Sequence, residues 1–234
     1  MKKVLMGFIL FFSAVSMNAQ KTTFMNMDKT SRMFYDSVFF VNPQFYPGVV
    51  ISVDGKQSSG PINICTVNQK LYFINPESDT LMVTNQENID RVYILGKAFV
   101  NSKYGYMQLL ETAGDVTLCE LRITEIHTDA APGAYGTKNQ TSATKALTYA
   151  EWSSSLLLHL DINADMAFSY SKKPFLFVKG EAYPVTQKNL VEYFPEHKKF
   201  IEQYLKEHNT NIHSVAPVLE LFNALKQKKS GPLF

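Results

Sequence analysis

The fold is indicated first by residues 106–126, with the sequence YMQLLETAGDVTLCELRITEI. Two β-rich runs flank Ala113-Gly114-Asp115, a tripeptide typical of a tight hairpin turn. In the second run Cys119, Leu121 and Ile123 alternate with polar residues, so their side chains lie on one face of a strand. The stretch therefore predicts an antiparallel hairpin with an apolar face.

Similar runs continue on both sides of this hairpin. On the N-terminal side, residues 49–53 lead into Asp54-Gly55, a strong tight-turn signal. On the C-terminal side, Lys179-Gly180-Glu181 indicates another turn. Further strands are expected at 62–67, 71–74, 80–84, 89–95, 154–162, 167–171, 175–178 and 182–185. Short strands with turns at this spacing predict an antiparallel sandwich or a partly closed barrel.

The last part of the chain, residues 186–234, has helical rather than strand periodicity. Thr186 can cap a first helix, and Pro195 suits the first turn of a second. Asn209 can end that helix in a left-handed conformation, and Ser214 can cap a third. The whole is an α+β arrangement with a C-terminal segment of two to three helices. Whether these helices cover the sheet or form a separate unit is left open by the sequence.

The N-terminus has the pattern of a secretory signal peptide. Lys2 and Lys3 precede an apolar run at 4–15, and Ala19 offers a small residue for cleavage before Gln20. The run is shorter than the roughly 20 apolar residues of a spanning helix. We therefore expect a secreted or periplasmic protein without a transmembrane segment in its mature chain. The expected organisation is a signal peptide at 1–20, a β-rich domain at 21–185 and a helical segment at 186–234.

Composition limits the classes of partner. Removal of residues 1–20 leaves 21 basic and 21 acidic residues, so the mature chain is neutral. A neutral chain gives no electrostatic basis for binding nucleic acid. The apolar content of 45% and aromatic content of 13% indicate a globular protein.

The two cysteines, Cys65 and Cys119, both lie in predicted strands. In an oxidising compartment they can form a disulfide. The alternative is a pair of separate buried thiols that act as small apolar side chains. The sequence leaves both states open.

No strong catalytic or cofactor motif occurs, and no cofactor is expected. The best metal candidates are two His-x-Asp pairs, His127 with Asp129 and His159 with Asp161. On a strand, residues two apart share a face, so two such pairs can supply four ligands. The simpler interpretation is a polar strand histidine beside an aspartate that begins a turn.

Residues 128–148 are rich in Ala, Thr, Gly and Ser and lack a clear period, so we expect a long loop. Within it, Tyr135 lies between Gly133 and Gly136. This places a candidate contact residue on a conformationally free support. Two interpretations are open, a binding loop and a plain surface loop.

The segment FPEHKKFIEQYLKEHN at 194–209 resembles the tails of uncharacterised secreted or periplasmic proteins of Bacteroidota-type bacteria. Residues 92–94, 99, 104–106 and 133–136 strengthen the resemblance. It implies an exported or envelope location and carries no activity. It also implies candidate O-glycosylation at Ser37 and Thr80, each between an aspartate and an aliphatic residue. The alternative is a turn-forming aspartate followed by a capping hydroxyl.

These observations favour a non-catalytic binding or interaction module, with an envelope protein or another extracytoplasmic component as its partner. Aromatic residues gathered at 34–46 are the candidate contact surface. The alternative is a hydrolase or metal-dependent enzyme whose site is built from His127, Asp129, His159 and Asp161.

Overall fold

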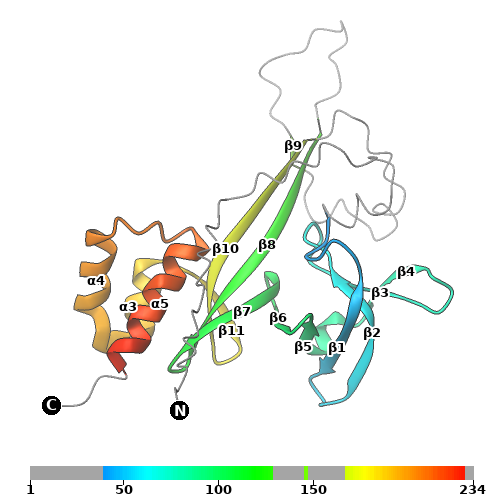
Figure 1. The fold of residues 1–234 in the computed structure, drawn as a ribbon, viewed down its shortest axis with the longest axis horizontal. Helices are drawn as coiled ribbons and strands as arrows, with labels where there is room; N and C mark the ends of the chain where they lie inside the picture. The colour runs from blue at the N-terminus through cyan, green and yellow to red at the C-terminus, as the bar shows by residue number, and fades with distance from the viewer. Residues whose placement is uncertain (1–38, 129–144, 147–166, 230–234) are drawn as a thin grey trace, which may run out of the picture.

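The structure is a computed structural model and describes residues 39–128, 145–146 and 167–229. Figure 1 shows its elements, and the labels below follow that figure. The strands are β1 (Tyr46–Ser52), β2 (Gln57–Ile64), β3 (Leu71–Ile74), β4 (Thr80–Met82), β5 (Ile89–Ile94), β6 (Lys97–Ser102), β7 (Gly105–Ala113), β8 (Val116–Thr128), β9 (Lys145–Ala146), β10 (Ala167–Val178) and β11 (Glu181–Pro184). The helices are η1 (Gln86–Asn88), α3 (Gln187–Tyr193), η3 (Pro195–His197), α4 (Lys198–Glu207) and α5 (Val215–Lys229).

The strands form one antiparallel sheet in the order β11-β10-β8-β7-β6-β5-β1-β2-β3-β4, and β9 pairs with β8. The expected α+β class is confirmed: a large antiparallel sheet that does not close is followed by three C-terminal helices. Because the sheet is continuous, it matches the expected partly closed arrangement better than two packed sheets.

The sheet curves until the β2–β3 turn reaches β8. The Thr124 backbone N–H donates to the Thr66 carbonyl oxygen at 3.0 Å. The two threonine hydroxyls share a hydrogen bond of 2.7 Å, and both side chains are buried. This contact fixes the curvature, since it joins residues that are 58 positions apart in the chain.

Three predicted turns are present, and each needs a glycine with positive φ. Gly55 connects β1 to β2, Gly114 connects β7 to β8, and Gly180 connects β10 to β11, with φ values of 81°, 64° and 86°. These are left-handed conformations that glycine adopts without a steric penalty.

Three predicted strands had the wrong bounds. The strands expected at 167–171 and 175–178 are one strand, β10, that runs through Pro174. Its ring nitrogen lies on the side of β11, where the pairing ends, and its carbonyl still accepts from the Val185 N–H at 3.3 Å. The strand expected at 62–67 instead begins at Gln57, and β6 was not predicted.

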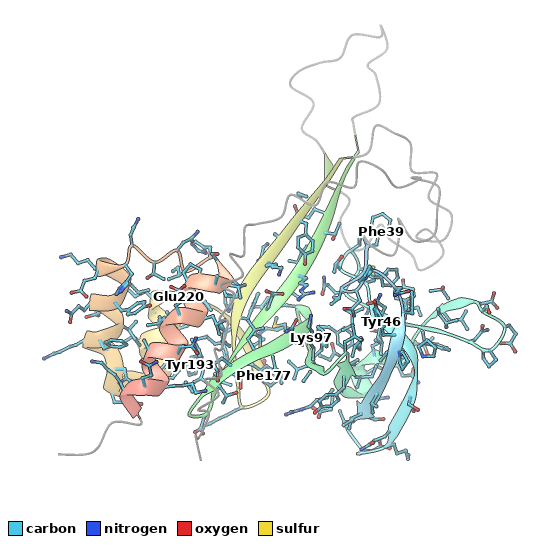
Figure 2. The ribbon with its side chains drawn as sticks, viewed as in Figure 1. Phe39, Tyr46, Lys97, Phe177, Tyr193 and Glu220 are labelled. Atoms are coloured by element: carbon cyan, nitrogen blue, oxygen red, sulfur yellow. The ribbon has the colours of Figure 1, made fainter. Side chains whose placement is uncertain are left out.

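The helices pack on one face of the β7–β8–β10 end of the sheet and share a core with it (Figure 1). Leu118 and Leu176 of the sheet pack with Leu190 of α3 and Phe222 of α5, all with 0% exposure. Figure 2 shows Tyr193 of α3 on the sheet side of the helical layer, where its ring lies 5.2 Å from that of Tyr183. Burial of each such apolar side chain stabilises the fold by about 1.5–3 kcal/mol, so the helical segment is an integral layer.

Local signals set the helix ends. Thr186 caps α3, as predicted, by accepting the Asn189 N–H at 3.1 Å. Asn209 follows α4 with a φ of 45°, also as predicted. Within the described ranges, no helix is both long and apolar enough to cross a membrane.

The other face of the same strands is also apolar. Cys119 and Leu121 of β8 pack there with Met107 and Phe175, and Ile123 contacts this cluster. The predicted apolar face of the hairpin is therefore confirmed. A further cluster lines the inner face of β1–β6 and contains Ile62, Ile64, Leu71, Val92, Ile94 and Phe99.

Candidate binding groove

A groove of about 1040 Å³ lies between the β1–β2 hairpin and the segment from β3 to η1. It opens because β2 and β3 pair over three residues only, Ile62–Ile64 with Leu71–Phe73. Beyond this short ladder the β3–β4 hairpin diverges from the β1–β2 hairpin (Figure 1). Residues 58–61, in the first part of β2, therefore border the groove.

The floor of the groove is apolar and belongs to the core of the sheet. Val50 of β1, Ile62 of β2 and Phe73 of β3 form this floor. Val83 and Ile89 line the groove from the segment that follows β4. All except Ile62 and Ile89 are only partly buried. The groove thus presents apolar surface to a ligand, and the packing of the core holds the side chains of this surface in place.

Gly60 leaves room along the wall. A Cβ placed on this residue meets no atom within 4 Å, whereas one on its strand partner Gly48 comes within 2.6 Å of the Ile62 side chain. Gly60 lies on the same strand face as Ile62, two positions away. A methyl group at position 60 therefore fits in open space, and a larger side chain there takes up groove volume.

The groove carries no uncompensated charge among its described lining residues. Its two charged side chains, Asp54 and Lys56, pair with each other at 2.7 Å. The hydrogen bonds from the side chain and backbone N–H of Lys56 lower the pKa of the Asp54 carboxyl. The groove is suited to a neutral, largely apolar ligand.

Buried amides hold the walls in place. Gln86 of η1 donates to the Val83 carbonyl at 2.8 Å and accepts the Leu71 N–H at 2.9 Å. The Val53 N–H donates to the Asn88 carbonyl at 2.9 Å and ties the β1 end to this wall. Because Gln86 is only 4% exposed, its two hydrogen bonds to the Val83 carbonyl and the Leu71 N–H are shielded from water.

A charged cluster is formed by Glu120 and Arg122 of β8 and Lys172 of β10. The Arg122 Nε and the Glu120 Oε1 are 2.6 Å apart, and their side chains are 14% and 7% exposed. Arg122 also donates to the Gln108 side chain at 2.9 Å and to the Val41 carbonyl at 3.3 Å. Lys172 of β10 lies 3.5 Å from Glu120. Each charge has a partner, so the cluster acts as a structural tie rather than a reactive centre.

Of the four candidate metal ligands, His127 alone lies within the described ranges. His127 lies in β8, opposite Ala167 of β10 and Ala146 of β9. Asp129, His159 and Asp161 lie outside the described residues, as do the loop candidates Gly133, Tyr135 and Gly136. Among the described residues, no group of three His, Cys, Asp or Glu side chains is placed to hold a metal ion.

Cys65 and Cys119 are free thiols in the structure, and both are buried. Burial raises the pKa of Cys65 to about 11 and that of Cys119 to about 12. A thiol that stays protonated at neutral pH is a poor nucleophile, so neither cysteine suits covalent catalysis.

Of the two candidate glycosylation residues, Thr80 lies within the described residues. Thr80 begins β4 and is half-buried, after a turn in which the Asp79 N–H donates to the Asn75 side chain at 2.7 Å. Asp79 therefore closes a turn that begins at Asn75. Ser37 lies outside the described residues.

The described part of the aromatic stretch is packed rather than exposed. Phe39 is 1% exposed, and the Phe40 ring contacts those of Phe45 and Tyr72 at 5.1 and 5.5 Å. These residues therefore anchor the start of the sheet. Phe34 and Tyr35 of that stretch lie outside the described residues.

Comparison with known proteins gives no match to a family model, to a curated protein or to a solved structure.

Proposed function

We propose that this protein is an exported, non-catalytic binding module of the cell envelope, and that the groove beside β2 is its ligand-binding surface. The observation that carries the proposal is the groove itself: about 1040 Å³, apolar, neutral and built on a rigid base. Its size lies at the upper end of the range for ligand sites, and its lining combines an apolar floor with serine and asparagine side chains and one ion pair.

Exposed apolar side chains near the groove support a binding role. Val53 at the tip of the β1–β2 hairpin is 67% exposed, and Leu81 of β4 is 41% exposed. Both belong to the two hairpins that form the groove walls. Apolar surface that gathers around a hollow is a common mark of a binding site.

The lining residues of the groove suit ligand binding better than catalysis. Among the described residues that line it, Asp54 and Lys56 are the only titratable groups, and they neutralise each other. A general acid or base needs a carboxyl, imidazole or amine that is free to exchange a proton with the ligand. The lining described here supplies ligand contacts and no such group.

The proposal is tested by filling the groove. Nile red, a neutral apolar dye, should bind the wild-type protein. We expect Gly60→Phe to weaken binding by about fivefold or more, because the ring takes up groove volume. Gly60→Ala is the matched control and should bind within about twofold of wild type, since it adds one methyl group in open space. Equal binding by all three proteins, with equal urea midpoints, would overturn the groove as the binding surface.

A further inference from the structure

We propose that the ligand is an extended, neutral peptide segment of another protein, which adds to the free edge of β2 as an extra strand. This inference rests on the proposed function and specifies its ligand. It follows from the free backbone edge at 57–61, of which residues 58–61 border the groove, and from the apolar floor beside it.

The register shows which backbone groups of β2 are free. Pro47 of β1 lies opposite Pro61 of β2, and neither residue has an N–H. This pair therefore belongs to the non-hydrogen-bonded positions of the ladder. Hydrogen-bonded and non-hydrogen-bonded pairs alternate, so Ser58 and Gly60 bond to β1, while Gln57 and Ser59 direct their backbone groups away from it.

Those outward groups are not used by the neighbouring strand. Asn63, in phase with Gln57 and Ser59, pairs with Tyr72 of β3, but the β3 ladder ends at Ile62. Within the described part of the chain, no strand pairs with the outer edge of residues 57–61. The N–H groups of Gln57 and Ser59 and the carbonyl groups of Gln57, Ser59 and Pro61 are thus available to a strand.

This edge has little of the usual protection against strand addition. Edges are commonly blunted by charged side chains, by prolines or by being very short. The two outer strands of the sheet follow this rule, because β4 has three residues and β11 contains Glu181 and Pro184. The free edge at 57–61 carries no charged side chain, and its one proline, Pro61, is its last residue. Residues 58–61 border a hollow that can accept a chain.

The groove floor defines the side chains of the incoming strand. Successive side chains of a strand point to opposite faces, so every second one faces Val50, Phe73 and Ile89. Because Asp54 and Lys56 neutralise each other, an unpaired charge on the ligand finds no partner there. The expected ligand has apolar residues at alternate positions over about five residues, the length of the free edge at about 3.3 Å per residue.

The test uses a phage-displayed library of random peptides of about ten residues, selected on the full mature chain. We expect enriched peptides with alternating apolar residues. Their affinity should fall by about tenfold or more in Ser59→Pro, which removes an outward N–H and places a ring in the path of the new strand. Ser59→Ala is the matched control and should bind within about twofold of wild type, since it keeps that N–H.

Two versions of an enriched peptide give a test that does not depend on the folding of a variant. N-methylation of alternate residues blocks either the backbone groups that face β2 or those that face away. We expect one version to lose about tenfold or more in affinity and the other to retain it. Equal affinities, or no enrichment of peptides on wild type over Ser59→Pro, would overturn strand addition.

The outcomes separate this inference from the proposed function. If Gly60→Phe abolishes peptide binding while Ser59→Pro and both methylated peptides bind normally, the groove binds ligands but not by strand addition. If neither substitution affects binding, both proposals fail.

Discussion

Replacing Glu120 by alanine should strongly destabilise the fold, because it leaves Arg122 without its anionic partner. The Arg122 side chain is only 14% exposed, and its remaining partners, the Gln108 side chain and the Val41 carbonyl, are neutral. Breaking a buried ion pair from one side costs about 3–5 kcal/mol. A fold of ordinary stability unfolds with about 5–15 kcal/mol, so the loss is a large fraction of the total.

Two comparison variants test the physical reason. Lys172→Ala should cost at most about 1 kcal/mol, because its side chain is 40% exposed and solvent screens its 3.5 Å contact with Glu120. The double variant Glu120→Leu with Arg122→Leu should cost less than Glu120→Ala alone. It removes both charges, and no unpaired charge stays buried.

The assay is urea unfolding at neutral pH, with the free energy compared at an unchanged denaturant slope. If Lys172→Ala costs as much as Glu120→Ala, solvent exposure does not control the strength of these pairs. A double variant that costs the sum of two large single losses would show that Glu120 and Arg122 act independently, against the geometry described here.

Three further predictions concern the core, the thiols and export. Phe222→Ala should lower the free energy of unfolding by about 3–5 kcal/mol, because the fully buried ring joins α5 to the sheet. Exposed Glu220 (Figure 2) provides the control Glu220→Ala, with a change within about 0.5 kcal/mol; equal losses would contradict the packing of α5. Denatured, unreduced protein should titrate two thiols, and a count of zero would contradict the free state of Cys65 and Cys119. Burial raises the pKa of both thiols above the ordinary 9.0, to about 11 and about 12, so unfolded thiols ionise first. Their contribution to stability is complete below pH 9 and is lost as the pH rises toward 12. Cys119→Ala should make this fall in urea stability shallower, and an unchanged slope would refute the assignment. Protein recovered after export should begin at Gln20 by N-terminal sequencing, and retention of Met1 would refute cleavage.

Much of the sheet could be predicted because its signals are local. The turns at Gly55, Gly114 and Gly180 follow from glycine at positions of positive φ. The alternation in β8 correctly placed Cys119 and Leu121 on one apolar face. Local capping chemistry likewise predicted the start of α3 at Thr186.

The groove could not be predicted in the same way. The β2 residues Gln57–Pro61 have weak strand propensity, and their pairing with β1 gives them an extended conformation. The divergence of β2 from β3 depends on tertiary packing, so no local sequence pattern predicts it. The charged cluster had a visible signal, Glu120 and Arg122 two positions apart on a predicted strand. Its burial depends on curvature that brings Val41 to Arg122 from 81 positions away.

Amide hydrogen exchange in the presence of an enriched peptide is the most direct test of ligand binding by strand addition. In the free protein the Gln57 and Ser59 amides should exchange faster than those of Ser58 and Gly60, which bond to β1. Saturating peptide should slow the Gln57 and Ser59 amides by about tenfold or more and leave those of α4 and α5 unchanged. Protection confined to the helices, or no change at Gln57 and Ser59 under saturating peptide, would contradict the account.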